Sequence, residues 1–289
     1  MQKRTDLKVW GLPGGVLELG EDILACARRE LQEETGLSAG PLSLVGVYSE
    51  PELDVRYPNG DQVQQFTICL AGEATGGQMR VDGVETSRQR FFDPGRLPWS
   101  HLPAWYTRML QDALSGNVPA FGAPQSMPQL TSQYEELRSI LGHDPLILAG
   151  AIGVTVRADG KILMVLRRDV QTWTFPGGFS DLGENAAHTA QRETQEETGL
   201  ETIPRRLMGV YTPRETYIYP NQDQVQTVAA IFQMRPAGGE LRKTGAETLD
   251  AAWMAPDAIL KLPAHPFIQP LHQAVIDHLL EGSFIIPSK

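Results

Sequence analysis

The sequence predicts an α/β fold in which one domain occurs twice. The hexapeptide QEETGL fills Gln32–Leu37 and returns 163 positions later at Gln195–Leu200. The octapeptide YPNGDQVQ at Tyr57–Gln64 returns as YPNQDQVQ at Tyr219–Gln226, one residue closer. This period is longer than that of a solenoid repeat, so it indicates a duplicated domain. Apolar β-branched runs alternate with amphipathic segments in each copy, which is typical of mixed strands and helices.

The second copy shows the expected elements in order. A short helix is predicted at 134–141, followed by two strands at 146–157 and 161–168 that the turn signal ADG separates as a hairpin. A glycine-rich loop and a helix follow, and then strands at 206–212 and 225–235. The amphipathic segment 267–282 predicts a terminal helix that ends at Gly282, and the segment ending at Gly116 is its counterpart in the first copy.

The boundaries follow from this alignment. We expect an N-terminal domain at 1–117, a linker rich in Pro, Ser and Gln at 118–133, and a C-terminal domain at 134–289. Trp10 aligns with Trp173, so the first copy has no counterpart of Leu146–Leu163. Either the true start lies upstream, or the first sheet lacks its N-terminal strand and exposes an edge. An exposed edge invites pairing with another chain, so a homodimer is one expected assembly.

Composition narrows the class of protein. The 289 residues carry a net charge of −10, which argues against a general binder of nucleic acid polymers or anionic membranes. Two cysteines are too few for a disulfide framework, which indicates a reducing compartment. The N-terminus has no apolar signal-peptide core, and no long apolar run predicts a membrane helix. We therefore expect a cytoplasmic protein.

The helix that contains each hexapeptide carries three crowded carboxylates. The first helix should run from about Glu21 to Thr35, with Gly36 as its C-terminal cap. Glu30, Glu33 and Glu34 then share one face, as do their counterparts Glu193, Glu196 and Glu197. Like charges at this spacing cost roughly 0.2–0.5 kcal/mol per pair. A solvated acidic face would explain an isolated pair, but a bound divalent cation explains the same triad occurring twice after a glycine-rich loop.

Both stretches resemble the Nudix box, G-x5-E-x7-R-E-U-x-E-E-x-G-U, where U is a bulky aliphatic residue. The first copy fits at every position, and the second departs only at Thr194, where an aliphatic residue is usual. The resemblance implies two α/β/α sandwich domains around mixed β-sheets. It also implies a pyrophosphohydrolase that cleaves nucleoside diphosphates linked to another moiety, in nucleotide-pool sanitation or in turnover of nucleotide sugars or ADP-ribose.

The resemblance further implies a role for each residue of the box. Mg²⁺ or Mn²⁺ would be held by the carbonyls of Gly14 and Gly177 and by carboxylates, with Glu21 and Glu184 holding a metal-bound water and Glu30 and Glu193 acting as ligand or general base. The remaining metal ligands would be Glu33, Glu34, Glu196 and Glu197. Arg29 and Arg192 would orient the adjacent glutamate. A further acid outside the box often assists, and Glu85 and Glu247 are the matching candidates.

Other expectations concern the substrate and the rival functions. Tyr57 and Asp61, with their counterparts Tyr219 and Asp223, read equally as turn structure or as the rim that binds a small nucleotide. A regulatory protein could use the same domain to sense a nucleotide, but such proteins usually carry a degenerate box. A diphosphate isomerase would need a placed cysteine, and Cys26 has no counterpart in the second copy. Hydrolysis is therefore favoured, with most activity in the second half, whose strands can support the loop.

Overall fold

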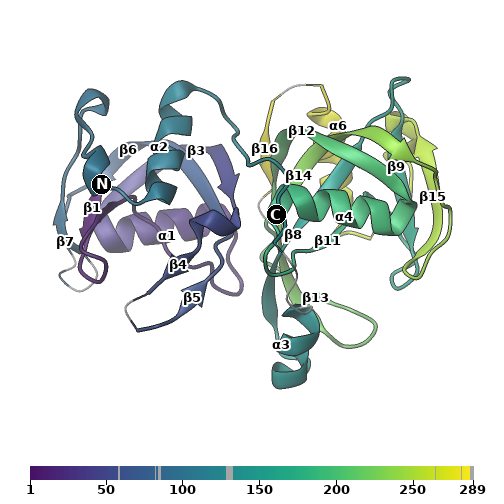
Figure 1. The fold of residues 1–289 in the computed structure, drawn as a ribbon, viewed down its shortest axis with the longest axis horizontal. Helices are drawn as coiled ribbons and strands as arrows, with labels where there is room; N and C mark the ends of the chain where they lie inside the picture. Colours follow the sequence, from purple (N-terminus) through teal and green to yellow (C-terminus); the bar gives the residue numbers. More distant parts are fainter. Residues whose placement is uncertain are drawn as a thin grey trace.

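A computed structural model describes every residue except 58, 82, 84–85, 128–132, 264, 281 and 287–289. Figure 1 shows two similar units side by side, the N-terminal unit coloured purple to blue and the C-terminal unit teal to yellow. Each unit combines strands with helices (Figure 1). The sheets of the C-terminal unit contain parallel and antiparallel pairs, and the paired strands described in the N-terminal unit are antiparallel. The predicted α/β fold with mixed sheets is therefore confirmed.

The N-terminal unit contains a three-stranded and a two-stranded sheet. The first sheet has the order β2-β1-β7 and the second pairs β3 with β6. A small hairpin, β4 with β5, projects from the body. The bounds are β1 Gln2–Arg4, β2 Trp10–Gly11, α1 Ile23–Thr35, β3 Leu37–Tyr48, β4 Val55–Arg56, β5 Gln62–Val63, β6 Thr67–Gly77, β7 Thr86–Gln89 and α2 Ala104–Ser115, with short 3-10 turns at Pro51–Leu53, Pro94–Arg96 and Trp99–His101.

The C-terminal unit has a larger set of strands. Its main sheet has the order β11-β8-β14-β12-β16, with β13 paired to β14, and its second sheet has the order β10-β9-β15. The bounds are α3 Gln133–Leu141, β8 Leu146–Thr155, β9 Ile162–Arg167, β10 Trp173–Thr174, β11 Gly177–Phe179, α4 Ala186–Thr198, β12 Leu200–Tyr211, β13 Tyr217–Ile218, β14 Gln224–Gly239, β15 Thr248–Met254, α5 Pro256–Ile259, α6 Gln269–Asp277 and β16 Phe284–Ile286.

Helices α1 and α4 have the same local signals at both ends. Asp22 caps α1 by accepting a hydrogen bond from Ala25 N at 2.8 Å, and Asn185 caps α4 by accepting one from His188 N at 2.9 Å. Gly36 and Gly199 end the helices with φ values of 73° and 76°. Glycine adopts this left-handed conformation without a steric cost, so it stops both helices at the same place.

Among the strands that the structure describes, the N-terminal unit has no counterpart of β8. Within the described residues, β6 pairs with β3 and has no second strand beside it, whereas its counterpart β14 lies between β12 and β8. This absence leaves Leu24, Ala27 and Leu31 of α1 only partly buried. Their counterparts in α4 are Ala187, Ala190 and Thr194, with exposures of 2%, 0% and 0%. The strand thus decides how firmly the helix is packed.

Segment 146–168 differs from the predicted hairpin. β8 runs parallel to β14, while β9 pairs with β10 and β15 in the other sheet. Arg157 N donates to Lys161 O at 2.9 Å, and an isolated antiparallel bridge joins Val156 to Ile162. Pairing between the two runs is thus confined to the turn, which forms a corner between two layers. The sequence of two apolar runs joined by a tight turn does not show whether the two strands pair with each other. That depends on strands from distant segments, here β14 and β15, which take the place of the neighbour.

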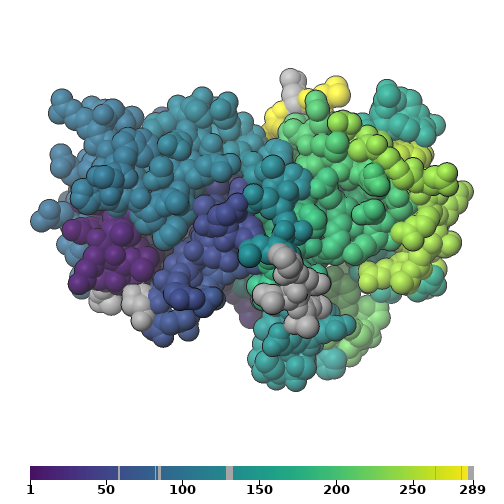
Figure 2. All heavy atoms as spheres, viewed as in Figure 1, coloured from purple at the N-terminus to yellow at the C-terminus, as the bar shows by residue number. Residues whose placement is uncertain are grey.

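The first residues of the predicted linker pack between the units. Ala120 donates to Val45 O at 2.8 Å and accepts from Val47 N at 3.0 Å, which extends the sheet of β3. The Phe121 ring lies edge-on to Phe232 of β14, with centroids 5.2 Å apart. One apolar cluster contains side chains of β3, α4, β12 and β14, and Figure 2 shows atoms of the two units meeting along a continuous seam. The units therefore share part of their core.

Two further features bear on the class of protein. In the described part of the chain, no helix has the length and apolarity needed to cross a membrane. Cys26 and Cys69 are both free thiols. Burial raises the pKa of the Cys26 thiol to about 12, so this thiol stays protonated near neutral pH and is a poor nucleophile.

Candidate active site

Each glycine-rich loop bends back over the last turn of its helix. Gly177 N donates to Glu197 Oε2 at 3.1 Å, and Gly14 N donates to Glu34 Oε2 at 2.7 Å. The backbone of Gly14 has φ 151°, which favours glycine. These bonds hold the first glycine of each loop against the last carboxylate of each triad.

The second glycine of each loop leaves room for another acid. A Cβ added at Gly178 would lie 2.5 Å from Glu193 Cδ, and one added at Gly15 would overlap the carboxylate of Glu30. A side chain at either position would push the acid away from the loop. The glycine doublet is therefore required because a carboxylate packs directly on the backbone.

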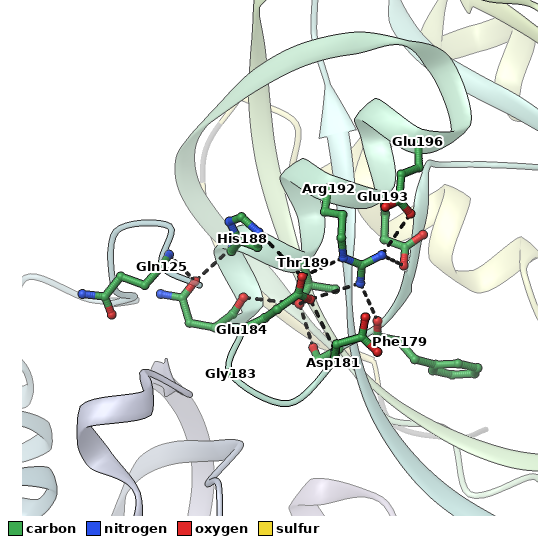
Figure 3. A network of polar contacts seen from close by, with 12 residues as sticks. Gln125, Phe179, Asp181, Gly183, Glu184, His188, Thr189, Arg192, Glu193 and Glu196 are labelled. Carbon is green, nitrogen blue, oxygen red and sulfur yellow. Dashed lines mark hydrogen bonds and ion pairs between the residues drawn. The ribbon is translucent and has the colours of Figure 1, made fainter. Parts of the chain in front are cut away.

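Arg192 gathers the acids of the C-terminal unit (Figure 3). Its Nε donates to Glu184 Oε1 at 2.7 Å, and its Nη1 donates to Glu193 Oε1 at 2.8 Å and to Glu196 Oε2 at 3.1 Å. Its Nη2 donates to the carbonyl of Phe179 at 3.0 Å and to Glu184 Oε2 at 3.1 Å. The planar fork thus fixes three carboxylates relative to the loop, which a lysine could not do.

Arg29 repeats this arrangement in the N-terminal unit. It donates to both oxygens of Glu21 at 3.1 and 2.6 Å, to Glu30 at 2.6 Å and to Glu33 at 3.3 Å. Its Nη2 reaches the carbonyl of Val16 at 3.1 Å. The two boxes have therefore kept the same network of ion pairs, although Leu31 and Thr194 differ in the helices beneath them.

Burial and crowding disfavour charge on the acids of the C-terminal unit. Burial, opposed by Arg192, raises the pKa of Glu193 to about 7. Burial and repulsion from Glu193 raise the pKa of Glu197 to about 8. The side chain of Glu196 is the most exposed of the triad, at 60%. Arg192 alone therefore does not compensate for the charge of the cluster.

The donor set suits a hard divalent cation. Carboxylates and a backbone carbonyl are the ligands that Mg²⁺ and Mn²⁺ prefer, and a cation would favour the charged forms of Glu193 and Glu197. In this arrangement Glu184, Glu193 and Glu196 accept hydrogen bonds from Arg192, and Glu197 accepts one from Gly177 N. The described residues contain no cluster of three Asp, Glu, His or Cys side chains that could hold a metal ion. The residues of each box thus supply the chemistry of a metal site, with side chains that would turn toward the ion.

A cavity of about 860 Å³ lies beside these acids in the C-terminal unit. Glu193, Glu196 and Glu197 line one side, and Glu247 lines it from the segment before β15. Arg167 lines it as well, and its guanidinium is paired with Asp169 at 2.6 Å. Aromatic rings, with Tyr134 stacked on Phe179 and Tyr217 packed edge-on to Tyr219, form other parts of the wall. The cavity therefore joins a cluster of acids to flat apolar surfaces.

The structure separates the four predicted rim residues. Tyr219 lines the cavity, whereas the carboxylate of Asp223 is buried and accepts hydrogen bonds from Tyr134 and Asn221. Tyr57 and Asp61 lie in the matching turn between β4 and β5, where Tyr57 N donates to Asp61 O at 2.9 Å. A role in substrate binding stays a prediction for all four. Glu85 lies outside the described residues.

Sequence reasoning missed several residues beside the boxes. Arg167 and Tyr134 line the cavity, and neither belongs to a recognised motif. Gln64 and Gln226 contact the box of the opposite unit. The only signal for these glutamines was their repetition in YPNGDQVQ and YPNQDQVQ. Such repetition shows that a residue matters to both units, but it does not show what the residue touches.

Comparison with known proteins identifies a family model and several relatives that are similar to this chain. A family model described as "NUDIX domain" matches residues 1–112 and 147–275. A candidate 8-oxo-dGTP diphosphatase of Bacillus subtilis (strain 168) is 39% identical over 101 residues, which are 35% of this chain and 61% of the relative. A "MutT-like protein" of Streptomyces ambofaciens is 35% identical over 115 residues, 40% of this chain and 68% of the relative.

This chain is also similar to a third relative, named for a different substrate, and to a solved structure. An "ADP-ribose pyrophosphatase" of Methanocaldococcus jannaschii is 37% identical over 89 residues, 31% of this chain and 48% of the relative. The chain therefore spans about half to two thirds of the length of these three relatives. The crystal structure of a NUDIX hydrolase from Nitrosomonas europaea aligns at 21% identity and a TM-score of 0.40, covering 49% of this chain and 79% of that one.

Proposed function

Because this chain belongs to the Nudix family of hydrolases, whose family model matches both halves, we propose that it is a divalent-metal-dependent pyrophosphohydrolase. Its substrate would be a small nucleotide in which a nucleoside diphosphate is linked to another moiety. One observation carries the proposal. Arg192 holds Glu184, Glu193 and Glu196 together at the edge of a cavity of about 860 Å³.

The metal would be held by the C-terminal triad and the loop. Glu193, Glu196, Glu197 and the carbonyl of Gly177 are the candidate ligands, and Glu184 would hold a metal-bound water. When bound, a divalent cation lowers the pKa of water and neutralises phosphate charge. The equivalent set in the N-terminal unit is Gly14, Glu21, Glu30, Glu33 and Glu34, tied together by Arg29.

The protein groups would supply orientation and proton transfer. Glu193 and its counterpart Glu30 stand as general base or metal ligand, and Glu247 is the further acid at the cavity. Arg192 would keep Glu193 pointing at the reacting phosphate. Arg167 would add positive charge beside the diphosphate. The rings of Tyr217 and Tyr219 offer faces on which a base can stack. Positioning and charge stabilisation account for most of the catalysis of phosphoryl transfer.

The names of the relatives support this substrate class. One relative is named for 8-oxo-dGTP and another for ADP-ribose, and both compounds contain a nucleoside diphosphate joined to a further group. The match spans 61% and 48% of these relatives. We therefore propose the shared bond, a phosphoanhydride, as the reacting group, and leave the attached moiety to experiment.

A screen of nucleotides tests the proposal. The full chain is incubated with Mg²⁺ and, separately, with 8-oxo-dGTP, unmodified dNTPs, ADP-ribose, dinucleoside polyphosphates, NADH and CDP-alcohols. Products are identified by ion-exchange chromatography. We expect a nucleoside monophosphate product from at least one compound, and its loss when the metal is chelated. Tight binding of a nucleotide without turnover would contradict hydrolysis and would support a nucleotide-sensing protein instead.

A further inference from the structure

Each unit reaches across the seam to the glycine-rich loop of the other. Gln64, which follows β5 in the N-terminal unit, accepts a hydrogen bond from Gly183 N at 2.6 Å and donates to Glu184 O at 2.7 Å. Gln226 of β14 accepts from Gly20 N at 2.8 Å and donates to Glu21 O at 2.7 Å. The two glutamines are counterparts in the repeat, and the two loops are counterparts as well. The contacts are therefore reciprocal.

A second reciprocal pair lies next to the first. Ser49 Oγ accepts from Ala186 N at 2.9 Å, and its counterpart Thr212 Oγ1 accepts from Ile23 N at 3.3 Å. Ser49 and Thr212 are 4% and 0% exposed. Both hydroxyl groups thus accept from the first residue of the box helix in the opposite unit. Two independent side chains in each unit reach the same stretch of the other.

The clamped backbone carries the acid that anchors the arginine. Glu184 N and O lie in the loop that Gln64 holds, and the carboxylate of Glu184 pairs with Arg192 at 2.7 Å. Arg192 in turn holds Glu193 and Glu196. A shift of the loop would therefore move the arginine and the acids with it. Gly183 has φ 89°, a left-handed conformation that favours glycine, at the point that Gln64 fixes.

We propose that Gln64 and Ser49 are positioning residues for the metal site of the C-terminal unit, and that Gln226 and Thr212 do the same for the N-terminal unit. Each box would then be completed by the unit that does not contain it. The N-terminal unit would thus serve the C-terminal site even where its own site contributes little turnover. This role rests on the proposed function, but the clamp itself is a property of the metal-free fold.

The amide of glutamine suits this position for a simple reason. It carries an acceptor oxygen and a donor NH2 on the same group, so it can satisfy the N–H of one residue and the carbonyl of the next on one backbone. A glutamate could still accept from Gly183 N, but it would face Glu184 O with a second acceptor. A leucine of similar size would leave both backbone groups without this partner. Gln64→Glu therefore removes one hydrogen bond to the loop, and Gln64→Leu removes both.

The test measures amide exchange and turnover in the full chain. Hydrogen exchange at Gly183 is measured without metal, and it should become about tenfold faster in Gln64→Leu, with Gln64→Glu in between. Turnover is measured in a Glu34→Gln background, so that it reports the C-terminal site. We expect kcat to fall about tenfold while KM for the nucleotide changes less than about twofold, because the cavity that binds the substrate is not clamped.

Gln62→Leu is the matched control, since Gln62 is an exposed residue of the neighbouring strand β5. It should leave Gly183 exchange and kcat unchanged. Ser49→Ala is the second variant, to be used if Gln64→Leu fails to fold. It removes the acceptor of Ala186 N and should therefore speed amide exchange at Ala186. Unchanged exchange in the clamp variants, or faster exchange with full kcat, would overturn the positioning role. If no nucleotide is hydrolysed, the proposed function fails, and the exchange data still decide whether the clamp exists.

Discussion

Thr194 of α4 lies directly over Gly153 of β8. A Cβ added at Gly153 would be 2.5 Å from Thr194 Oγ1 and 3.3 Å from the carbonyl of Ala190. Thr194 Oγ1 donates to that same carbonyl at 2.7 Å and is fully buried. The side chain of Thr194 therefore fits a site where α4 packs directly against a glycine of the sheet. In the N-terminal unit the counterpart is Leu31, and no strand corresponding to β8 is found there among the described residues.

Gly153→Ala should destabilise the protein. The added methyl would force α4 away from β8, and overpacking of this kind costs about 1–3 kcal/mol. Thr194→Ala in the same chain should restore part of the loss, since it removes the atom that the methyl meets. Urea unfolding followed by circular dichroism measures both effects. Gly76→Ala is the control, because no atom lies within 4 Å of its added Cβ. Equal stability of the Gly153 and Gly76 variants would contradict the close packing.

The C-terminal site should carry most of the turnover. Its helix is fully packed against β8, while α1 is only partly buried along the matching stripe. A metal site needs its supporting elements held within a fraction of an ångström. Glu197→Gln should therefore lower kcat by about 10²-fold or more, and Glu34→Gln by less than about threefold. Steady-state kinetics on the substrate found in the screen decides between them. The reverse order would make the N-terminal site dominant.

Removal of one ligand from each box should abolish catalysis without unfolding the chain. Glu33→Gln combined with Glu196→Gln keeps the size of both side chains, and both are 60% exposed. Nearly all Mg²⁺-dependent turnover should be lost. The metal-free melting temperature should be unchanged or slightly higher, because like charges near each helix end are removed. Wild-type turnover in this double variant would show that the metal-site assignment is wrong.

Acid should destabilise the fold through His272. This residue of α6 is 2% exposed, with its ring edge-on to Phe175, and burial lowers its pKa to about 4. The unfolded state, with a pKa near 6.5, then binds more protons between pH 6.5 and 4. This contribution to stability is complete above pH 6.5 and is lost as the pH falls toward 4. Melting temperatures measured across this window should fall more steeply in the wild type than in His272→Phe.

The control for this pH effect is a histidine on the surface. His101 is exposed, so His101→Ala should leave the slope of melting temperature against pH unchanged. If His272→Phe keeps the full wild-type slope, the acid sensitivity arises elsewhere, for example from buried carboxylates whose ion pairs are lost on protonation.

The sequence by itself determined the features that depend on neighbouring residues or that recur in both copies of the repeat. Gly36 is predicted as the end of the first box helix, and the structure confirms it as the C-terminal cap. The start was expected at about Glu21, whereas the helix begins at Ile23 with Asp22 as its N-cap. The glycine doublets and the glutamates stand at fixed spacing on one helix, so the two boxes and their family could be recognised.

Only the tertiary structure decided how distant segments meet. The corner between β8 and β9 was indistinguishable from a hairpin until β14 and β15 supplied the partners. The burial of Thr194 depends on Gly153, and the clamp on Glu184 depends on Gln64, 120 residues earlier in the chain. The sequence does not show whether a polar side chain faces water or binds a loop of the other unit. Packing across the seam assigns the partner, and no local pattern encodes it.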